Sequence, residues 1–158
     1  MFRAKRVLAL IPAIAILSPG MGCGGGGSER VTAAELVQRA DAICAKERSS
    51  FARIQAHPPP NASVAAGQTD ELIKVTKDAN TQLRDLKPPE GLQSSYDSYL
   101  EARDRVIDQM HRGKDAAQDQ DSAAYGAAQA AVARDATQRR KLARSLGLRV
   151  CSSSSATA

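Results

Sequence analysis

The two histidines are the residues whose spacing most readily suggests a reactive site. His111 follows Asp108 by three positions, and on a helix this places both side chains on one face, as in half of a di-metal carboxylate site. A complete site needs the motif twice and two further inward carboxylates. The other histidine, His57, lies in a proline-rich segment. We therefore interpret Asp108 and His111 as surface residues and expect neither a metal site nor a cofactor.

No recognisable pairing of a nucleophile with a base is present either. The serines form short clusters at 49–50, 94–95 and 152–155, and none stands in the G-x-S-x-G turn of a hydrolase. Asp115, Asp119 and Asp121 lack the spacing of a calcium-binding loop. We expect no catalytic residues and no enzyme activity.

Glu47 and Arg103 are charged residues that interrupt otherwise apolar helical stripes. Each lies at a similar distance from the start of its predicted helix. If those helices run in the same direction, the two residues lie at similar height. The sequence predicts an inward-leaning ion pair. The alternative is that both aliphatic stems follow the boundary of the core and leave their charged ends in water.

Residues 1–22 have the layout of a bacterial secretion signal. A basic segment precedes an apolar run at residues 7–17 that is interrupted only by Pro12, and this run is too short for a permanent bilayer span. Residues 20–23 resemble the lipobox of bacterial lipoproteins, although Gly20 stands where an aliphatic residue is usual. We expect cleavage before Cys23, lipidation of Cys23 and a Gly-rich tether over residues 23–30. Without lipidation the protein would be secreted.

The basic character of the chain comes partly from this signal. The full chain carries 22 basic and 17 acidic residues, for a net charge of +5. Loss of Arg3, Lys5 and Arg6 would lower the net charge to about +2, because every acidic residue lies after Cys23. Basic and acidic residues alternate along the remainder, as on a solvated helix face. We expect no nucleic-acid partner.

The number of cysteines is consistent with an exported protein. If Cys23 takes the lipid, Cys44 and Cys151 remain as an even pair in an oxidising compartment. A disulfide between them would close a long loop and stabilise the fold by roughly 4–5 kcal/mol. The alternative is two inert thiols.

The pattern of the remaining chain predicts an all-α fold. Aromatic residues make up only 3% of the chain, and alanine, the best helix former, is frequent. Apolar stripes at helical spacing begin after the capping box Thr32–Glu35, near Leu72, at Leu92 and near Asp121. Four helices with short connections predict an up-down-up-down bundle over residues 31–151.

The ends and connections complete this prediction. Residues 57–69 are predicted to be a loop, with Ser63 as an alternative, earlier start of the second helix. Gly147 followed by Leu148 predicts the end of the fourth helix. The next residues should leave the helix extended and run back beside the first helix, so that Cys151 reaches Cys44. Residues 152–158 are polar and are predicted to be a disordered tail.

Three segments carry a resemblance to a known group. The sequences ADAIC at 40–44, LKPP at 86–89 and LGLRVC at 146–151 resemble those of small secreted helical proteins and lipoproteins of high-GC Gram-positive bacteria. The resemblance implies a helical bundle, a Cys44–Cys151 disulfide and a location in the cell envelope. It implies no activity and no catalytic residue.

Together these features predict a lipid-anchored protein on the extracytoplasmic face of the membrane. Its role would be binding or spacing, with an envelope protein or a cell-wall polymer as partner. The alternative is a carrier of a small ligand or metal, which requires a cavity between the helices. Tyr96, Tyr99 and Tyr125 could line such a groove, or they could belong to the core.

Overall fold

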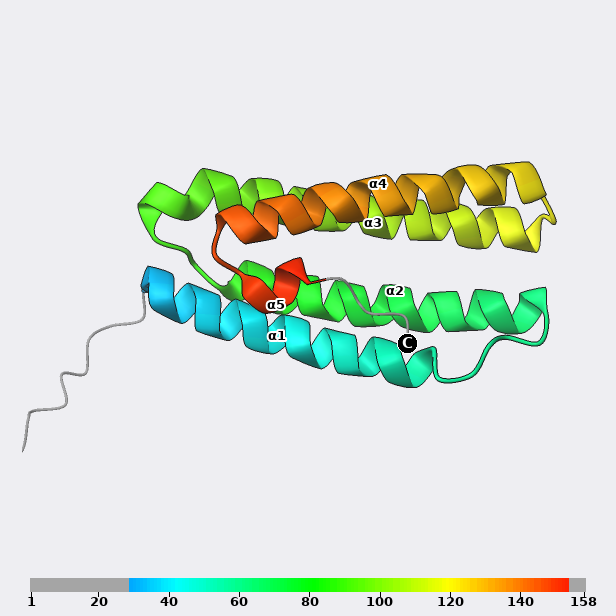
Figure 1. Ribbon diagram of the computed structural model, residues 1–158, viewed down its shortest axis with the longest axis horizontal. Coiled ribbons are helices and arrows are strands. Elements are labelled where there is room, and N and C mark those ends of the chain that lie inside the picture. Colours follow the sequence, from blue (N-terminus) through cyan, green and yellow to red (C-terminus); the bar gives the residue numbers. More distant parts are fainter. Residues whose placement is uncertain (1–28, 154–158) are drawn as a thin grey trace, which may run out of the picture.

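In the computed structural model, residues 29–153 are described, and every regular element in that range is a helix (Figure 1). The all-helical fold expected from the sequence is therefore confirmed for this part of the chain. No helix in it combines the length and apolar character needed to cross a bilayer. The elements are α1 (Ala33–Ile54), α2 (Ala62–Asp85), the 3₁₀ turn η1 (Glu90–Leu92), α3 (Gln93–Gln118), α4 (Ser122–Ser145) and α5 (Arg149–Ser152).

Side-chain caps define where α1 and α4 begin. Thr32 and Glu35 form the expected capping box at the start of α1: Glu35 N donates to Thr32 Oγ1 at 3.2 Å, and Thr32 N donates to Glu35 Oε2 at 2.9 Å. Asp121 caps α4 by accepting from Ala124 N at 2.9 Å. Each cap satisfies a backbone donor that would otherwise lack an intrahelical partner.

The segment predicted as a loop between the first two helices is shorter than expected. Helix α2 begins at Ala62, so residues 62–69 are helical and the loop predicted over 57–69 is wrong for most of its length, whereas the alternative of an early helix start at Ser63 agrees with the structure to within one residue. Asn61 caps the helix by accepting from Val64 N at 3.0 Å. This cap and the alanines that follow it favour a helix directly after the three prolines.

The long helices contact one another in chain order, α1 with α2, α2 with α3, and α3 with α4. The short α5 contacts both α1 and α4 and lies between them in Figure 1. Arg30, which the sequence assigned to the tether, donates to Pro88 O and to Gln93 Oε1, both at 2.8 Å. Arg30 therefore belongs with the helical domain.

The chain reverses at Gly147, as predicted, but its course afterwards differs from the prediction. Gly147 adopts φ +77°, and Leu148 N donates to Ala143 O at 2.9 Å, which closes the end of α4. Residues 149–152 then form α5 instead of an extended strand. The predicted tail boundary at residue 152 is also wrong, because Ser152 is helical. The reason for the helix is a cap supplied by α1, described below.

The core is built around the first half of α1. Leu36, Leu83, Leu148, Tyr96 and Tyr99 are almost completely buried. Tyr96 OH donates to Leu83 O at 2.8 Å, so this buried hydroxyl has a partner. Tyr96 and Tyr99 are thus core residues, and only Tyr125 of the three tyrosines is exposed.

Candidate functional site

The structure brings Cys44 and Cys151 together in a disulfide that ties α5 to α1. The two sulfur atoms are 2.11 Å apart and the two Cα atoms 5.2 Å apart. Asp41, one turn before Cys44, accepts hydrogen bonds from the backbone N–H groups of Arg149, Val150 and Cys151 at 3.0, 2.9 and 3.1 Å. A carboxylate at this position satisfies the free donors at the start of α5. It explains why the chain after Leu148 is helical.

Glu47 and Arg103 also lie together, and they form the inward-leaning ion pair that the sequence predicts. Arg103 Nη2 is 2.7 Å from Glu47 Oε1, and the two side chains are 1% and 10% exposed. Arg103 also donates through Nε to Asn80 and through Nη1 to Tyr99 OH, the latter at 3.2 Å. Each guanidinium nitrogen therefore has a partner, which a buried arginine requires.

The electrostatic balance at Arg103 follows from these contacts. Burial by itself lowers the pKa of Arg103, but the Glu47 carboxylate and then Tyr99 outweigh burial and raise it above its ordinary value. Arg103 is therefore a fixed positive charge at any accessible pH, and Glu47 is its carboxylate partner.

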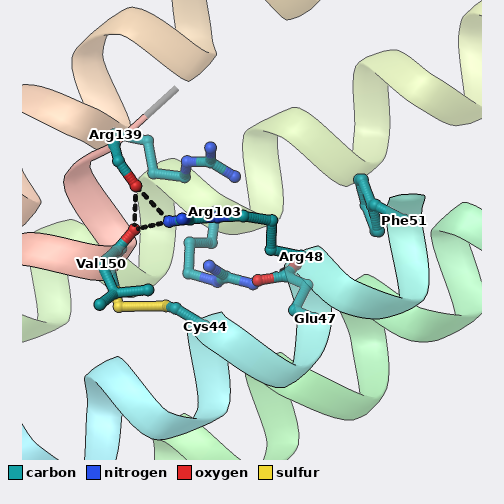
Figure 2. A pocket seen from close by; sticks show the side chains of 9 residues that line it. Cys44, Glu47, Arg48, Phe51, Arg103, Arg139 and Val150 are labelled. Atoms are coloured by element: carbon teal, nitrogen blue, oxygen red, sulfur yellow. Dashed lines mark hydrogen bonds and ion pairs between the residues drawn. A yellow bond between two sulfur atoms is a disulfide. The ribbon is translucent and has the colours of Figure 1, made fainter. Parts of the chain in front are cut away.

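Two further arginines lie beside this pair (Figure 2). Arg48, from α1, donates to Val150 O at 2.6 Å and to Ser153 Oγ. Arg139, from α4, has a buried Nε with no hydrogen-bond partner within residues 29–153. Burial lowers the pKa of Arg139, and the nearby charge of Arg103 lowers it further, while Glu47 partly opposes the change. Positive charge therefore exceeds negative charge here.

We call the small cavity between these side chains the arginine pocket. It has a volume of about 50 Å³. It is lined by Cys44, Glu47, Arg48, Phe51, Arg103, Arg139, Val150, Cys151 and Ser153. It thus carries three guanidinium groups and one carboxylate.

A larger cleft, which we call the α1–α4 groove, adjoins the arginine pocket. Its volume is about 320 Å³, and side chains from α1, α2, α3 and α4 line it. Phe51 and Arg139 line both cavities, so the two cavities adjoin each other. The large apolar side chains of the groove are Phe51, Leu72, Val106, Met110, Tyr125 and Val132.

Helix α5 contributes no lining residue to the groove. Helix α5 contacts α4 and the middle of α1, around Asp41 and Cys44. It ends at Ser152, so it does not extend toward the end of α1 where Phe51 and Gln55 line the groove. The small side chains Ala65, Ala66, Ala117 and Ala136 also line the cleft and fill little of its volume.

The charged side chains that line the groove are all cationic: Lys114, Arg139 and Arg140. Lys114 Nζ is 3.0 Å from Asp70 Oδ1, and Arg140 donates to Thr137 Oγ1 at 3.0 Å. Of these three cationic side chains, Arg139 has neither a carboxylate nor a hydroxyl group as a hydrogen-bond partner among the described residues.

The remaining residues considered from the sequence lie apart from this site. Asp108 is exposed, and His111 Nε2 is 3.0 Å from Lys77 Nζ. Across residues 29–153 no group of three or more His, Cys, Asp or Glu side chains could hold a metal ion. The proposed lipidation of Cys23, and the signal that precedes it, lie outside the described residues.

Sequence reasoning did not single out Asp41 or Arg139 as site residues. The sequence nevertheless contains a feature that points to each of these two residues. Asp41 lies three residues before Cys44, which places both on one helix face. Arg139 interrupts an apolar stripe in the same way as Arg103.

Comparisons with known proteins add no relative of this chain. No family model, no curated protein and no solved structure matches it.

Proposed function

We propose that this protein binds a small apolar or amphipathic ligand in the α1–α4 groove. The observation that carries the proposal is the groove itself, with a volume of about 320 Å³ and six large apolar side chains along it. That volume lies at the lower end of the roughly 300–1,000 Å³ typical of small-molecule sites. Two hollows of about 400 and 430 Å³ elsewhere are more open to solvent and are lined by few side chains.

The dimensions of the groove favour an elongated ligand. Its lining residues on α3 run from Val106 to Ala117, a distance of about 16 Å at 1.5 Å per residue. Burial of a methylene group is worth about 0.8 kcal/mol, so a medium-length alkyl chain along this line would gain substantial affinity. This role needs no catalytic residue, and we propose a non-catalytic protein.

The setting of this function is also part of the proposal. We infer that Cys23 is lipidated after signal cleavage and that the Gly-rich tether holds the domain at the extracytoplasmic face of the membrane. The short connections and the chain-order contacts support an up-down-up-down arrangement of the four long helices. Replacement of Cys23 by Ser should move the protein from the membrane fraction to the medium. Retention in the membrane would contradict the anchor.

A fluorescence titration tests the groove. The neutral probe N-phenyl-1-naphthylamine should bind saturably, with a blue-shifted and stronger emission. Ala136→Phe places a large ring in the groove and should abolish this binding. Ala133→Phe is the matched control, because Ala133 lies on the exposed face of the same helix, and it should bind the probe as the wild type does. No saturable binding, or equal binding by Ala136→Phe, would contradict the proposed function.

An interaction surface for an envelope protein or a cell-wall polymer is the second candidate. The observation that favours it is the exposure of Tyr125 and Val64, which are 42% and 41% exposed. Cross-linking in the living cell would identify such a partner.

A further inference from the structure

Arg139 differs from the other arginines around the arginine pocket in having unmet hydrogen-bonding capacity. Arg103 is paired with Glu47 at 2.7 Å, and Arg48 donates to Val150 O and Ser153 Oγ. The buried Nε of Arg139 has no partner among residues 29–153. A buried donor without an acceptor is costly, and this cost disappears when a ligand supplies the acceptor.

The local charge points to the kind of acceptor that would fit. Three guanidinium groups and one carboxylate line the arginine pocket, and that carboxylate, Glu47, is already bonded to Arg103. In the adjoining groove the charged lining is cationic throughout. An anionic oxygen near Arg139 would therefore meet an excess of positive charge in a partly desolvated site, where charge-assisted hydrogen bonds are strong.

Two lining residues shared by the cavities connect this charge to the apolar groove. Arg139 and Phe51 line both cavities. Figure 2 places Arg139 on the α4 side of the arginine pocket and Phe51 further along α1. A ligand whose apolar part lies among Val106, Met110 and Val132 can therefore present one end to Arg139.

We infer that the ligand of the α1–α4 groove is an amphipathic anion, an alkyl chain that ends in a carboxylate or phosphate held by Arg139. The planar guanidinium group matches both head groups, since it can donate two parallel hydrogen bonds to either. This inference rests on the proposed function and adds the chemical class of the ligand. Arg48 and Arg103 supply the surrounding positive charge, while their own donors remain on Val150, Ser153 and Glu47.

The test is displacement of N-phenyl-1-naphthylamine by three ligands of equal chain length: decanoate, decyl phosphate and 1-decanol. They are compared on the full chain at neutral pH, below their aggregation concentrations. We expect the two anions to bind about tenfold or more tightly than the alcohol, as a charge-assisted hydrogen bond implies. The stronger of the two anions identifies the head group.

Two variants test whether Arg139 is the cause of the tighter binding of the anions. Arg139→Gln should remove the advantage of the anions over 1-decanol. Arg134→Gln removes the same charge from an exposed position on the same helix and should preserve the advantage. Circular dichroism verifies that both variants are folded.

The outcomes distinguish the inferred head group of the ligand from the proposed binding function. Equal binding of the alcohol and the anions would overturn the inference and leave the proposed function intact. An equal loss of the anion preference in Arg134→Gln would also overturn it, because the preference would then come from general charge. Absence of saturable probe binding would instead overturn the proposed function, on which the inference depends.

Discussion

The carboxylate of Asp41 accepts a hydrogen bond from the backbone N–H of Cys151 at 3.1 Å, within one helical turn of the disulfide formed by Cys44. The same carboxylate accepts from Arg149 and Val150. One residue of α1 therefore both caps α5 and fixes the position of the cysteine that α5 carries. Since Val150 and Cys151 also line the arginine pocket, Asp41 indirectly shapes that cavity.

Replacement of Asp41 by Ala should lower the free energy of unfolding by about 1–2 kcal/mol, the usual cost of losing a helix cap. Asp108→Ala is the control, because Asp108 is exposed, and its effect should lie within about 0.5 kcal/mol of zero. Urea denaturation of both variants measures the difference. Equal effects would mean that the Asp41 hydrogen bonds do not stabilise α5.

Removal of the disulfide should have a larger effect. The sequence separation of Cys44 and Cys151 is 107 residues, so the bridge restricts most of the unfolded chain. The double variant Cys44→Ala, Cys151→Ala should lose about 2–5 kcal/mol of stability. A reducing agent should lower the melting temperature of the wild type and leave that of the double variant unchanged. A similar shift in both would show that the reductant acts elsewhere.

The helices and the disulfide could be predicted because their signals are local or depend on residue counts. The capping box at Thr32, the cap at Asp121 and the stop at Gly147 each lie within a few residues of the helix end they define. The cysteine pairing followed from the number of cysteines left after Cys23.

The structure of the tail and the presence of the groove could not be predicted, because both depend on distant residues. Helix α5 forms because Asp41, more than 100 positions away, caps it. The groove is lined by side chains from four helices that are far apart in the sequence. Periodicity indicates which residues face inward, but it does not indicate how completely facing side chains fill the space between helices.

Glu47 and Arg103 should show strong energetic coupling. In a double-mutant cycle with Glu47→Gln and Arg103→Met, each single variant leaves a buried charge without its opposite charge and should lose about 3–5 kcal/mol. The double variant should lose clearly less than the sum of the two, because both charges are then absent. The exposed pair Glu35–Arg39, at 3.7 Å, is the comparison, and its coupling should be at most about 0.5 kcal/mol. Coupling of equally small size at Glu47–Arg103 would contradict a buried ion pair.

Tyr96 should make the protein sensitive to alkaline pH. Burial raises the pKa of Tyr96 above its ordinary value of 10.0, and Tyr99 adds to the rise, while Arg103 partly opposes it. The folded state therefore holds the proton more tightly than the unfolded state. This contribution to stability is complete below pH 10 and declines as the pH rises above it.

The variant Tyr96→Phe tests that dependence. It should lose about 1 kcal/mol at neutral pH, because the hydrogen bond to Leu83 O is gone. Above pH 10 its stability should decline less steeply than that of the wild type. Tyr125→Phe, at an exposed position, should change neither value. Parallel pH profiles for Tyr96→Phe and the wild type would contradict a raised pKa at Tyr96.

Arg139 should be a residue that limits the stability of the protein in the absence of ligand. Its buried Nε lacks a partner among residues 29–153, and the positive charge of Arg103 lies nearby. Arg139→Met retains an apolar stem of similar length and removes the unsatisfied donor. We expect the free energy of unfolding to remain equal or to rise by about 1 kcal/mol. The same substitution at Arg103, whose donors are satisfied, should be strongly destabilising.

Ligand-dependent stability completes this test. Decanoate should raise the melting temperature of the wild type more than that of Arg139→Met, because a ligand stabilises only the state that binds it. Arg134→Met, at an exposed position, should resemble the wild type with and without ligand. A loss of more than about 1 kcal/mol in ligand-free Arg139→Met would show that Arg139 stabilises the fold. The unsatisfied donor would then be an inadequate reason to expect an anion at this site.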